Sequence, residues 1–384
     1  MIPWRNLKRF FRKTLRQPGY AGRVFLKRLA AYATYRLGRG TSAMPEAITF
    51  FLTHRCNLHC TMCGQWGEGG VTKKHSVDYV RQELSLTTLK KIVAQVALFK
   101  PNITLFGGEP LLHAHCIELI RSIKRTGMHC LMITNGSLLS QAAEELVASG
   151  LDELNLSLDG DASIHDTIRG MPGLFDTIMT GLGKIRAAKA HAARKKPLVN
   201  LQCTITRYNY MQLEQLIDVA SQAHADSLTF HNLIFLTPDS IARQKEYDRL
   251  LGCSSHDWEG FVFSPEIDPE ILFSKIQAIR SRRYPFDVDF YPNFTLGELI
   301  DYYRKPDSEL YQRLVRCLSP WMVGYVFPDG ELRPCLNSTY SFGNIQHTTF
   351  QGAWNSERAV DFRTALRKNR AFPACVRCTE LYRY

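Results

Sequence analysis

Residues 47–63 read AITFFLTHRCNLHCTMC, and this stretch decides the fold. Its first seven residues, AITFFLT, are apolar or β-branched, which is typical of a strand buried inside a sheet. The residues that follow include Cys56, Cys60 and Cys63. We therefore expect these cysteines on the loop that leaves the carboxyl end of the strand, where proteins of alternating strands and helices place their chemistry.

The spacing of the three cysteines indicates a metal centre that lacks one protein ligand. Cys56, Cys60 and Cys63 are close enough in sequence to surround one cluster. Four thiolates normally complete a 4Fe-4S cluster, so a set of three leaves one iron for a small molecule. A zinc ion held by these thiolates and by His54 or His59 is the alternative that the triplet alone leaves open.

A glycine-rich turn follows the next predicted strand. The apolar run 103–106 ends in Gly107-Gly108-Glu109-Pro110. Two adjacent glycines allow a bulky ligand to approach the backbone, and the Glu109 carboxylate suits an ammonium group. A Gly-Gly-Glu-Pro run on its own is more often an ordinary turn, so its position after a strand is what makes it informative.

Two further predicted strands, 129–134 and 153–158, also end in polar residues. Asn135 follows the first strand, and Asp159 follows the second. For Asp159 and for His165, helix entry and local hydrogen bonding are favoured over direct catalysis. Polar residues able to bind a ligand therefore follow several strands in succession.

In this order and at this separation, the segments between residues 47 and 236 resemble the radical SAM superfamily. The resemblance implies that S-adenosylmethionine completes a 4Fe-4S cluster on the three cysteines. Reduction of that cluster would release a 5'-deoxyadenosyl radical, which takes a hydrogen atom from the substrate. The resemblance implies contacts to S-adenosylmethionine from seven residues: Met62, Gly107, Gly108, Glu109, Asn135, Ser157 and Arg169. Among them, Glu109 would hold the amino group, and Ser157 and Arg169 the carboxylate and ribose. For Met62, ordinary packing is the competing interpretation.

Strand and helix signals alternate along the first two thirds of the chain. Strands are predicted at 47–53, 102–106, 129–134, 153–158, 198–205 and 227–236, and the helices between them include 86–99, 117–124, 174–188 and 211–221. Regular alternation of this kind indicates an α/β fold with a parallel sheet. The family resemblance implies an open (β/α)6 partial TIM-type barrel with a lateral opening for a large substrate.

Four more cysteines stand near the carboxyl end: Cys317, Cys335, Cys375 and Cys378. Residues 327–334, FPDGELRP, contain an Asp-Gly pair that predicts a β-hairpin between the first two of these cysteines. The pattern resembles the SPASM/twitch extension behind many radical SAM barrels. The resemblance implies a small, shortened C-terminal α+β domain that holds a second, auxiliary 4Fe-4S cluster. Structural zinc on the same thiolates is the alternative.

The expected division of the chain is a basic amphipathic arm at 1–45, a radical SAM partial barrel at 46–236, a variable connecting region at 237–316 and the auxiliary-cluster domain at 317–384. Cys253 is a candidate hydrogen-atom donor to a substrate radical, with an incidental loop cysteine as the competing interpretation. We assign no other catalytic residue. Cys116, Cys130 and Cys203 are interpreted as buried small hydrophobes.

Positive charge is concentrated at the amino end. Of 48 Lys and Arg, eleven lie in the first forty of 384 residues, where there is no Asp or Glu. Apolar residues recur among them at helical spacing, and basic amphipathic helices bind anionic membranes, so peripheral membrane contact through residues 1–40 is our leading hypothesis. Helices packed on the barrel and a transit peptide are the alternatives. Nucleic acid is not expected, because no recognition module accompanies the basic residues.

The cysteine content and the absence of long apolar runs predict the cellular compartment of the protein. Eleven cysteines without a secretory signal indicate a reducing compartment, and no apolar run approaches the length of about 20 residues that a membrane span needs. We expect a cytoplasmic protein, on the inner face of the membrane if the arm binds lipid. The implied partners are an electron donor such as flavodoxin or ferredoxin and a substrate that is a sugar, a lipid or a lipid-linked envelope precursor. A peptide- or protein-modifying (maturase-type) radical SAM enzyme is the alternative. A non-catalytic metal-binding module is a hypothesis of a different functional class.

Overall fold

One ten-stranded sheet organises the residues that the computed structural model describes, 18–313 and 316–383. Its strand order is β10-β9-β8-β1-β2-β3-β4-β5-β6-β7. Strands β1 to β7 run parallel, β8 runs parallel to β1, and β9 and β10 add an antiparallel edge. The strands are β1 (Ala47–Phe51), β2 (Asn102–Phe106), β3 (Cys130–Thr134), β4 (Glu153–Ser157), β5 (Leu198–Thr204), β6 (Ser227–His231), β7 (Asp287–Tyr291), β8 (Val323–Val326), β9 (Glu331–Arg333) and β10 (Gly343–Asn344).

The sheet is an open barrel, as expected, because within the described residues its order begins at β10 and ends at β7. All six predicted strands are present as β1 to β6. Two parallel strands come in addition: β8, beside β1, and β7, from the region expected to be a connection. Strand β7 has the sequence DVDFY, and its two aspartates are poor strand formers, so the sequence pattern did not reveal it.

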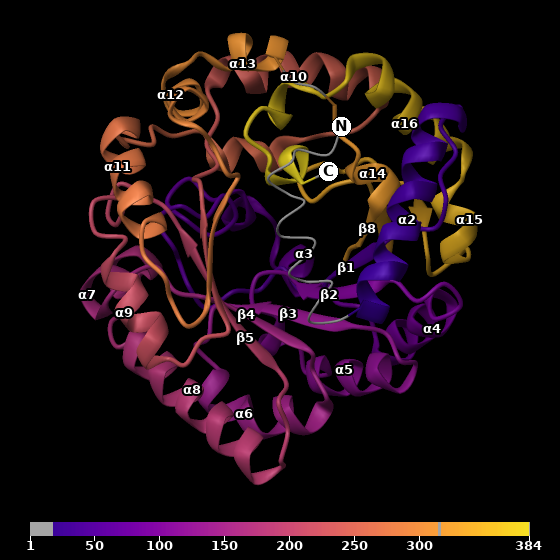
Figure 1. The fold of residues 1–384 in the computed structure, drawn as a ribbon. Helices are drawn as coiled ribbons and strands as arrows, with labels where there is room; N and C mark the ends of the chain where they lie inside the picture. Colours follow the sequence, from indigo (N-terminus) through magenta and orange to yellow (C-terminus); the bar gives the residue numbers. More distant parts are fainter. Residues whose placement is uncertain (1–17, 314–315, 384) are drawn as a thin grey trace.

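Helices surround the sheet as an outer layer (Figure 1). Several helices carry the caps that their sequences predict. In α7 (Ala162–Arg169), for example, Asp161 accepts a hydrogen bond from the Ile164 amide (3.0 Å) at the start, and Gly170 ends the helix in a left-handed conformation (φ 69°). The first helices are α2 (Pro18–Leu37), α3 (Val77–Arg81), α4 (Leu86–Val96), α5 (Cys116–Arg125), α6 (Leu139–Ser149), α7 (Ala162–Arg169), α8 (Leu174–His191) and α9 (Gln215–Gln222).

The later helices connect β6 to β7 and complete the carboxyl end. They are α10 (Pro238–Leu251), α11 (Pro269–Arg280), α12 (Leu296–Arg304), α13 (Asp307–Arg313), α14 (Ser319–Met322), α15 (Phe350–Trp354) and α16 (Glu357–Asn369). Five short 3-10 helices lie among them and near the site: η1 (Val71–Lys74), η2 (Pro110–Leu112), η3 (His256–Phe261), η4 (Pro373–Cys375) and η5 (Thr379–Tyr382). The division into four segments stays a prediction, although the last segment shares the sheet through β8.

The two faces of the central strands differ in polarity. Along β4 and β5, buried residues alternate with half-buried ones, as expected when one face packs on helices and the other lines a lumen. The half-buried face is polar: the Asn200 side-chain amide donates to Asn155 (3.0 Å) and to Glu153 (2.9 Å), and Gln202 pairs with His231 (2.7 Å). The half-buried face of β4 and β5 is therefore polar and partly accessible.

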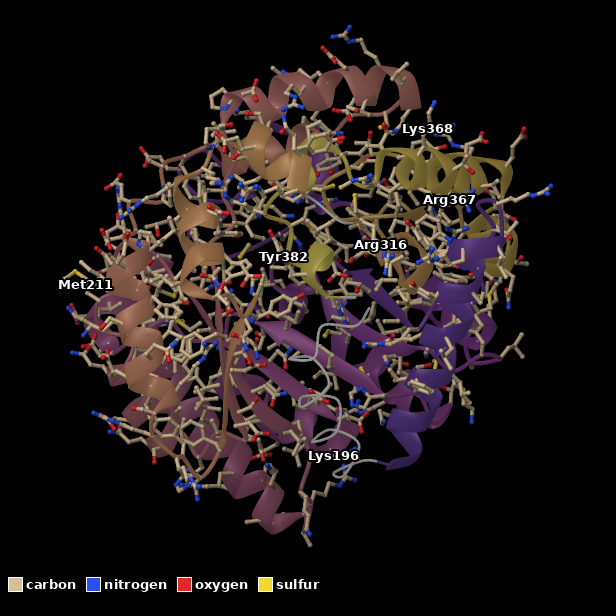
Figure 2. All side chains as sticks on the ribbon, turned by 45° about the horizontal axis from the view of Figure 1, so that its top comes forward. Lys196, Met211, Arg316, Arg367, Lys368 and Tyr382 are labelled. Atoms are coloured by element: carbon tan, nitrogen blue, oxygen red, sulfur yellow. The ribbon has the colours of Figure 1, made fainter. Side chains whose placement is uncertain are left out.

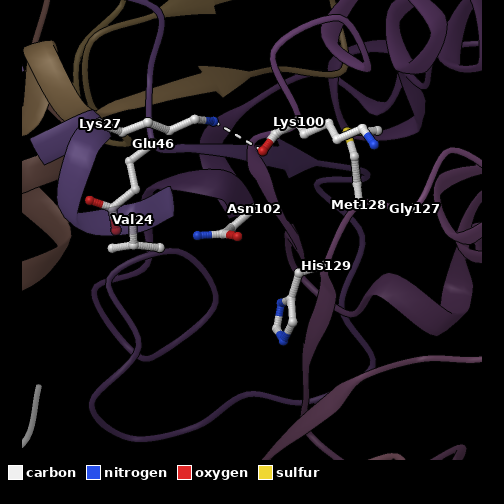
Figure 3. Close-up of a pocket in the computed structure, with 8 residues that line it drawn as sticks. All are labelled: Val24, Lys27, Glu46, Lys100, Asn102, Gly127, Met128 and His129. Carbon is white, nitrogen blue, oxygen red and sulfur yellow. Dashed lines mark hydrogen bonds between the residues drawn. The ribbon is translucent and has the colours of Figure 1, made fainter. Parts of the chain in front are cut away.

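Helix α2 packs at the amino ends of the strands. Its Arg28 guanidinium makes two bonds to the buried Glu46 carboxylate (2.6 and 2.9 Å), and Tyr35 packs edge-on against Trp321 (5.0 Å between ring centroids). Figure 3 shows a pocket beneath this helix, where the Lys27 ammonium donates to the Lys100 carbonyl (3.0 Å). Helix α2 thus packs on the barrel, and residues 1–17 of the basic arm lie outside the described residues.

None of the helices in the described part of the chain combines the length and the apolar character that crossing a bilayer requires. Four apolar side chains of α2 are exposed: Phe25, Leu26, Leu29 and Leu37.

Candidate active site

The loop with the first three cysteines lies between β1 and η1 and folds tightly on itself. The Cys63 amide donates to the Cys60 carbonyl (3.0 Å), and the Gly67 amide donates to the Cys63 carbonyl (2.9 Å). Position 67 requires glycine, because a Cβ atom there would lie 2.5 Å from the Cys63 carbonyl oxygen. Cys60 is buried and Cys56 is half-buried, and the pKa of Cys56 is raised by burial and by its proximity to Cys60 and Cys63.

An N–H group faces each of the three sulfur atoms. The Trp66 amide donates to the sulfur of the third cysteine (3.4 Å). The Asn135 side-chain amide lies 3.9 Å from the Cys56 sulfur, and the Arg169 guanidinium lies 3.8 Å from the Cys60 sulfur. These donors come from the loop itself, from the end of β3 and from the end of α7. Two of the predicted cofactor-binding residues therefore meet at the cysteine loop.

The Glu109 carboxylate is completely buried beneath this loop and is surrounded by hydrogen-bond donors. It accepts hydrogen bonds from the Thr134 hydroxyl (2.8 Å), the Asn135 amide (2.8 Å) and the Leu111 amide (3.1 Å). Burial raises the pKa of Glu109, and these donors oppose the shift. The carboxylate thereby connects η2 to the end of β3, and its contact with an ammonium group stays a prediction.

The two glycines before Glu109 allow their loop to approach the cysteine loop. A Cβ atom at Gly108 would lie 2.1 Å from the Arg55 carbonyl oxygen, and one at Gly107 would lie 2.6 Å from that of Thr53. Gly107 also has a positive φ of 147°. Two backbone bonds join the loops, from the Gly108 amide to the Thr53 carbonyl (2.8 Å) and from the Glu109 amide to the Arg55 carbonyl (2.9 Å).

Asp159 and His165 hold Arg169 beside the cluster loop. Asp159 accepts a bond from the Arg169 guanidinium (2.6 Å), and its amide donates to His165 Nδ1 (3.1 Å). Burial alone would lower the pKa of Arg169, but the Asp159 carboxylate raises it above its ordinary value. Burial lowers the pKa of His165 to about 4, so its ring is neutral. Local hydrogen bonding is thus confirmed for Asp159 and His165.

The other two predicted contacts lie at the same end of the barrel. Met62 precedes the third cysteine, is half-buried and packs against the hydrophobic core. Ser157 is the last residue of β4 and is half-buried. Both positions are compatible with binding a cofactor, and their roles stay predictions.

The donor set at this site fits an iron–sulfur cluster. Burial raises the pKa of Cys56 to about 12, so its thiolate form depends on a cationic metal in the site. N–H donors face the sulfurs, as anionic ligands require, and the buried Arg169 cation offsets their charge. Three thiols without a fourth leave a position for an exogenous ligand.

The four C-terminal cysteines gather at a second site: Cys317 before α14, Cys335 after β9, Cys375 in η4 and Cys378 at the start of η5. Each thiol is close enough to at least one other to affect its ionisation. Burial raises the pKa of Cys335 to about 12 and that of Cys375 to about 11, so this site also favours a bound metal centre over free thiolates.

The predicted hairpin before Cys335 is present. Gly330 adopts a positive φ of 85°, and the Glu331 amide donates to the Asp329 carboxylate (2.9 Å). Strands β8 and β9 pair antiparallel on either side of this turn. The Asp-Gly pair therefore brings Cys335 back toward Cys317.

A buried ion pair that the sequence did not reveal anchors the last two cysteines. Arg377, between them, pairs with Asp307 and donates to the Tyr302 carbonyl (2.8 Å). Although burial alone would raise the pKa of Asp307, Arg377 holds it below its ordinary value. Seventy residues separate the partners, and nothing in the local pattern around Asp307 distinguishes it from a surface residue.

Cys253 lies near the second site. Its sulfur is 3.8 Å from the Ser338 hydroxyl, three residues beyond Cys335, and burial raises its pKa to about 11. A neutral thiol can donate a hydrogen atom, but the role predicted for Cys253 stays a prediction. Cys116, Cys130 and Cys203 are fully buried, as interpreted from the sequence.

The chain end reaches back over the barrel. The Tyr291 hydroxyl at the end of β7 donates to the Thr379 carbonyl (2.6 Å), and Tyr382 packs edge-on against Phe294 (5.4 Å). Figure 2 shows Tyr382 near the centre of the view. The segment directly after Cys378 is therefore in contact with the carboxyl end of β7.

Comparison with known proteins agrees with both sites. A sequence model of the radical SAM superfamily matches residues 50–220, and a model of the SPASM iron–sulfur cluster-binding domain matches residues 317–379. A tungsten-containing aldehyde ferredoxin oxidoreductase cofactor-modifying protein of Pyrococcus furiosus is 24% identical over 349 residues, 85% of each chain. An AdoMet-dependent heme synthase of Methanosarcina barkeri is 28% identical over 324 residues, 83% of this chain and 84% of its own.

Solved structures show the same fold. Streptococcus suis SuiB bound to S-adenosylmethionine has a TM-score of 0.59 at 14% identity, covering 85% of this chain and 69% of its own. Native anSMEcpe with bound AdoMet has a TM-score of 0.52 at 16% identity, covering 83% and 82%. The cofactors are therefore S-adenosylmethionine, a 4Fe-4S cluster and an auxiliary iron–sulfur cluster. This chain is an enzyme of the radical SAM superfamily with a C-terminal SPASM domain.

Proposed function

We propose that this enzyme abstracts a hydrogen atom from a polar, hydroxyl-bearing small molecule, a sugar or a lipid-linked sugar, held in the lumen of the open barrel. The observation that carries the proposal is the chemistry of the strand ends beside the cysteine loop. Gln202, His231 and Tyr291 are half-buried there, on neighbouring strands β5 to β7. Hydroxyl, amide and imidazole groups of this kind recognise hydroxyl groups by hydrogen bonds.

In this proposal, one group of residues binds the cofactors and another orients the substrate. Cys56, Cys60 and Cys63 hold the 4Fe-4S cluster, with Glu109 and Arg169 contacting S-adenosylmethionine. When bound, these two groups supply hydrogen-abstraction chemistry, and the protein's part is to bind, orient and shield. The pairs Gln202–His231 (2.7 Å) and His231–Tyr291 (5.8 Å between centroids) fix the side chains that would orient the substrate.

The relatives favour a small molecule over a peptide. Curated relatives that align over most of both chains are named for modifying a cofactor, making heme or cyclising GTP. A tetrapyrrole would need broad apolar walls, whereas the inner face here carries Asn155, Asn200, Gln202 and His231. A peptide or protein substrate is the second candidate, and a test must include both classes.

The test is an anaerobic assay with reductant, S-adenosylmethionine and ring-deuterated sugars, nucleotide sugars and lipid-linked sugars. We expect deuterium from one of them in 5'-deoxyadenosine. Replacement Gln202→Leu should raise KM about tenfold, because it leaves the partly buried His231 without the partner that orients its ring toward the substrate. The matched control is Gln212→Leu at an exposed position. Deuterium transfer only from a tetrapyrrole or a peptide would contradict the proposed substrate class.

We propose that the auxiliary cluster on Cys317, Cys335, Cys375 and Cys378 accepts the second electron, which makes the net reaction an oxidation or a bond-forming cyclisation. Replacement of Cys335 or Cys378 by Ala would then leave deoxyadenosine formation intact and abolish the product. Loss of soluble protein would instead assign the cluster a structural role and leave epimerisation, decarboxylation or group transfer open.

We further propose that flavodoxin or ferredoxin supplies the first electron and that residues 1–40 contact an anionic membrane, which would place the enzyme on its inner face. Support for the membrane contact is the outward face of α2, where Leu26 is 66% exposed and Leu29 is 50% exposed amid basic residues. A lipid-linked sugar would be presented at such a surface.

A further inference from the structure

Two histidines and an aspartate converge outside both cysteine sites. His75 Nε2 lies 3.1 Å from His256 Nε2, and His256 Nε2 lies 3.1 Å from an Asp257 carboxylate oxygen. One possible ligand atom from each of the three residues lies within 4.8 Å of those of the other two. His75 and His256 are 181 positions apart in the sequence, so the fold brings these side chains together.

Two short helices hold these side chains in place. His75 directly follows η1, and its amide donates to the Thr72 carbonyl (3.2 Å). His256 and Asp257 begin η3, which packs directly on the cysteine loop: a Cβ atom at Gly260 would lie 1.9 Å from the Gly64 carbonyl oxygen. The three side chains therefore sit on backbone that has little room to move.

Neighbouring groups orient both rings. The Ser254 hydroxyl lies 3.2 Å from His256 Nδ1, which directs Nε2 of that ring toward the other two residues. The His75 ring stacks on Tyr79 (4.1 Å between centroids), which stacks in turn on His54 (4.4 Å). A hydrogen bond to the far ring nitrogen is what metal-ligating histidines almost always make.

The separations match a small divalent metal ion. Tetrahedral zinc with Zn–N and Zn–O distances of about 2.0–2.1 Å keeps its ligand atoms about 3.3 Å apart. Both pairwise distances given above are 3.1 Å. We propose that His75, His256 and Asp257 form a binding site for a divalent transition metal of the zinc type.

Such a site would keep one coordination position for another ligand. Three protein ligands with an open fourth position are the arrangement of catalytic zinc sites. The His256 side chain is 35% exposed and that of Asp257 is 14% exposed, so water or an oxygen ligand can reach the ion. The site is independent of the sugar proposal, because it needs no particular substrate.

The test uses the anaerobic holoenzyme with both clusters intact. After brief chelation and desalting, the protein is titrated with Zn²⁺ in competition with a chromogenic chelator. Bound metal is counted by mass spectrometry, and cluster content is followed by visible absorbance. We expect one zinc ion per chain beyond the cysteine sites, and X-ray absorption should show nitrogen and oxygen neighbours at about 2.0–2.1 Å without sulfur at about 2.3 Å.

Variants distinguish this site from other histidines and from the cysteines. His256→Gln and Asp257→Asn should weaken zinc binding at least tenfold, and Ser254→Ala should weaken it about tenfold through the orientation of His256. His191→Gln, at the exposed end of α8, is the matched control and should bind as the unaltered enzyme does.

Equal zinc binding by the unaltered enzyme and His256→Gln at equal cluster content would overturn the proposal. A sulfur shell around the zinc, or no bound zinc, would overturn it as well. These readouts do not involve turnover, so they stay separate from any failure of the proposed sugar substrate. Should the His256 and Asp257 variants lose their clusters, Ser254→Ala decides the question alone.

Discussion

At the scale of single residues, Glu109 shows why a carboxylate and an amide are not interchangeable at this site. Three donors surround the buried carboxylate, from Leu111, Thr134 and Asn135. Gln at this position would turn an NH2 group toward one of these donors. We expect Glu109→Gln to lower the free energy of unfolding by about 1–3 kcal/mol and to suppress deoxyadenosine formation.

The measurement is denaturant unfolding of the anaerobic protein, together with chromatography of the cleavage product. Glu144→Gln, at an exposed position on α6, is the control and should change neither quantity. A fully active Glu109→Gln enzyme would remove Glu109 from the proposed cofactor contacts.

His165 gives a pH dependence at the same scale. Its pKa is about 4 in the folded protein and about 6.5 in the unfolded chain, so between these values the unfolded state binds more protons. Stability from this residue is present above pH 6.5 and is lost as the pH falls toward 4. The residue is completely buried, and we expect its contribution to fall by about 2 kcal/mol between pH 7 and pH 5.

Comparing the unaltered enzyme with His165→Gln tests this expectation. The unfolding free energy of the variant should change less between pH 7 and pH 5, by about 2 kcal/mol. Identical pH profiles for the two proteins would show that His165 is not held neutral by burial.

At the scale of elements, the approach of two loops depends on glycine. A Cβ atom at Gly108 would lie 2.1 Å from the Arg55 carbonyl oxygen, and backbone cannot give way as a flexible side chain can. We expect Gly108→Ala to separate the η2 loop from the cysteine loop and to reduce bound iron and deoxyadenosine formation together.

The control for that variant is Gly69→Ala, in the same cysteine loop, where a Cβ atom would meet no atom within 4 Å. It should keep the iron content and the activity of the unaltered enzyme, measured by iron analysis and product chromatography. Loss of iron in both variants would mean that the loop tolerates no added methyl group, and the close approach would not be the cause.

At the scale of the whole molecule, the predicted basic arm includes α2, whose inner face holds Ala31 and Tyr35 against the barrel. Its outer face leaves Leu26 exposed. Each basic residue near an anionic surface contributes about 1 kcal/mol of binding, and salt screens that attraction. We expect the full-length protein in the membrane fraction at low salt and in the supernatant at high salt.

Leu26→Glu should reduce the low-salt membrane fraction at least tenfold, since it removes apolar contact and adds repulsion. Leu250→Glu, 83% exposed on α10, is the matched control and should leave the distribution unchanged. Protein that stays entirely in the supernatant at low salt would refute the membrane contact.

The six strands β1 to β6, the cysteine loop and the Asp-Gly hairpin could be predicted because each is encoded by a local pattern. Alternating apolar runs and turn residues act over a few positions, and cysteine spacing is itself a local feature. Strand β7 could not be predicted, because Asp287 and Asp289 join the sheet only through their pairing with β6.

By itself, the sequence determined the chemistry of this protein: three clustered cysteines followed by a strand-end Gly-Gly-Glu-Pro turn, and a second cysteine set near the carboxyl end. The tertiary structure alone decided which distant side chains meet. The Arg377–Asp307 pair and the His75–His256 pair join residues that are 70 and 181 positions apart. Spacing along the chain carries no information about such contacts, because packing of whole elements determines them.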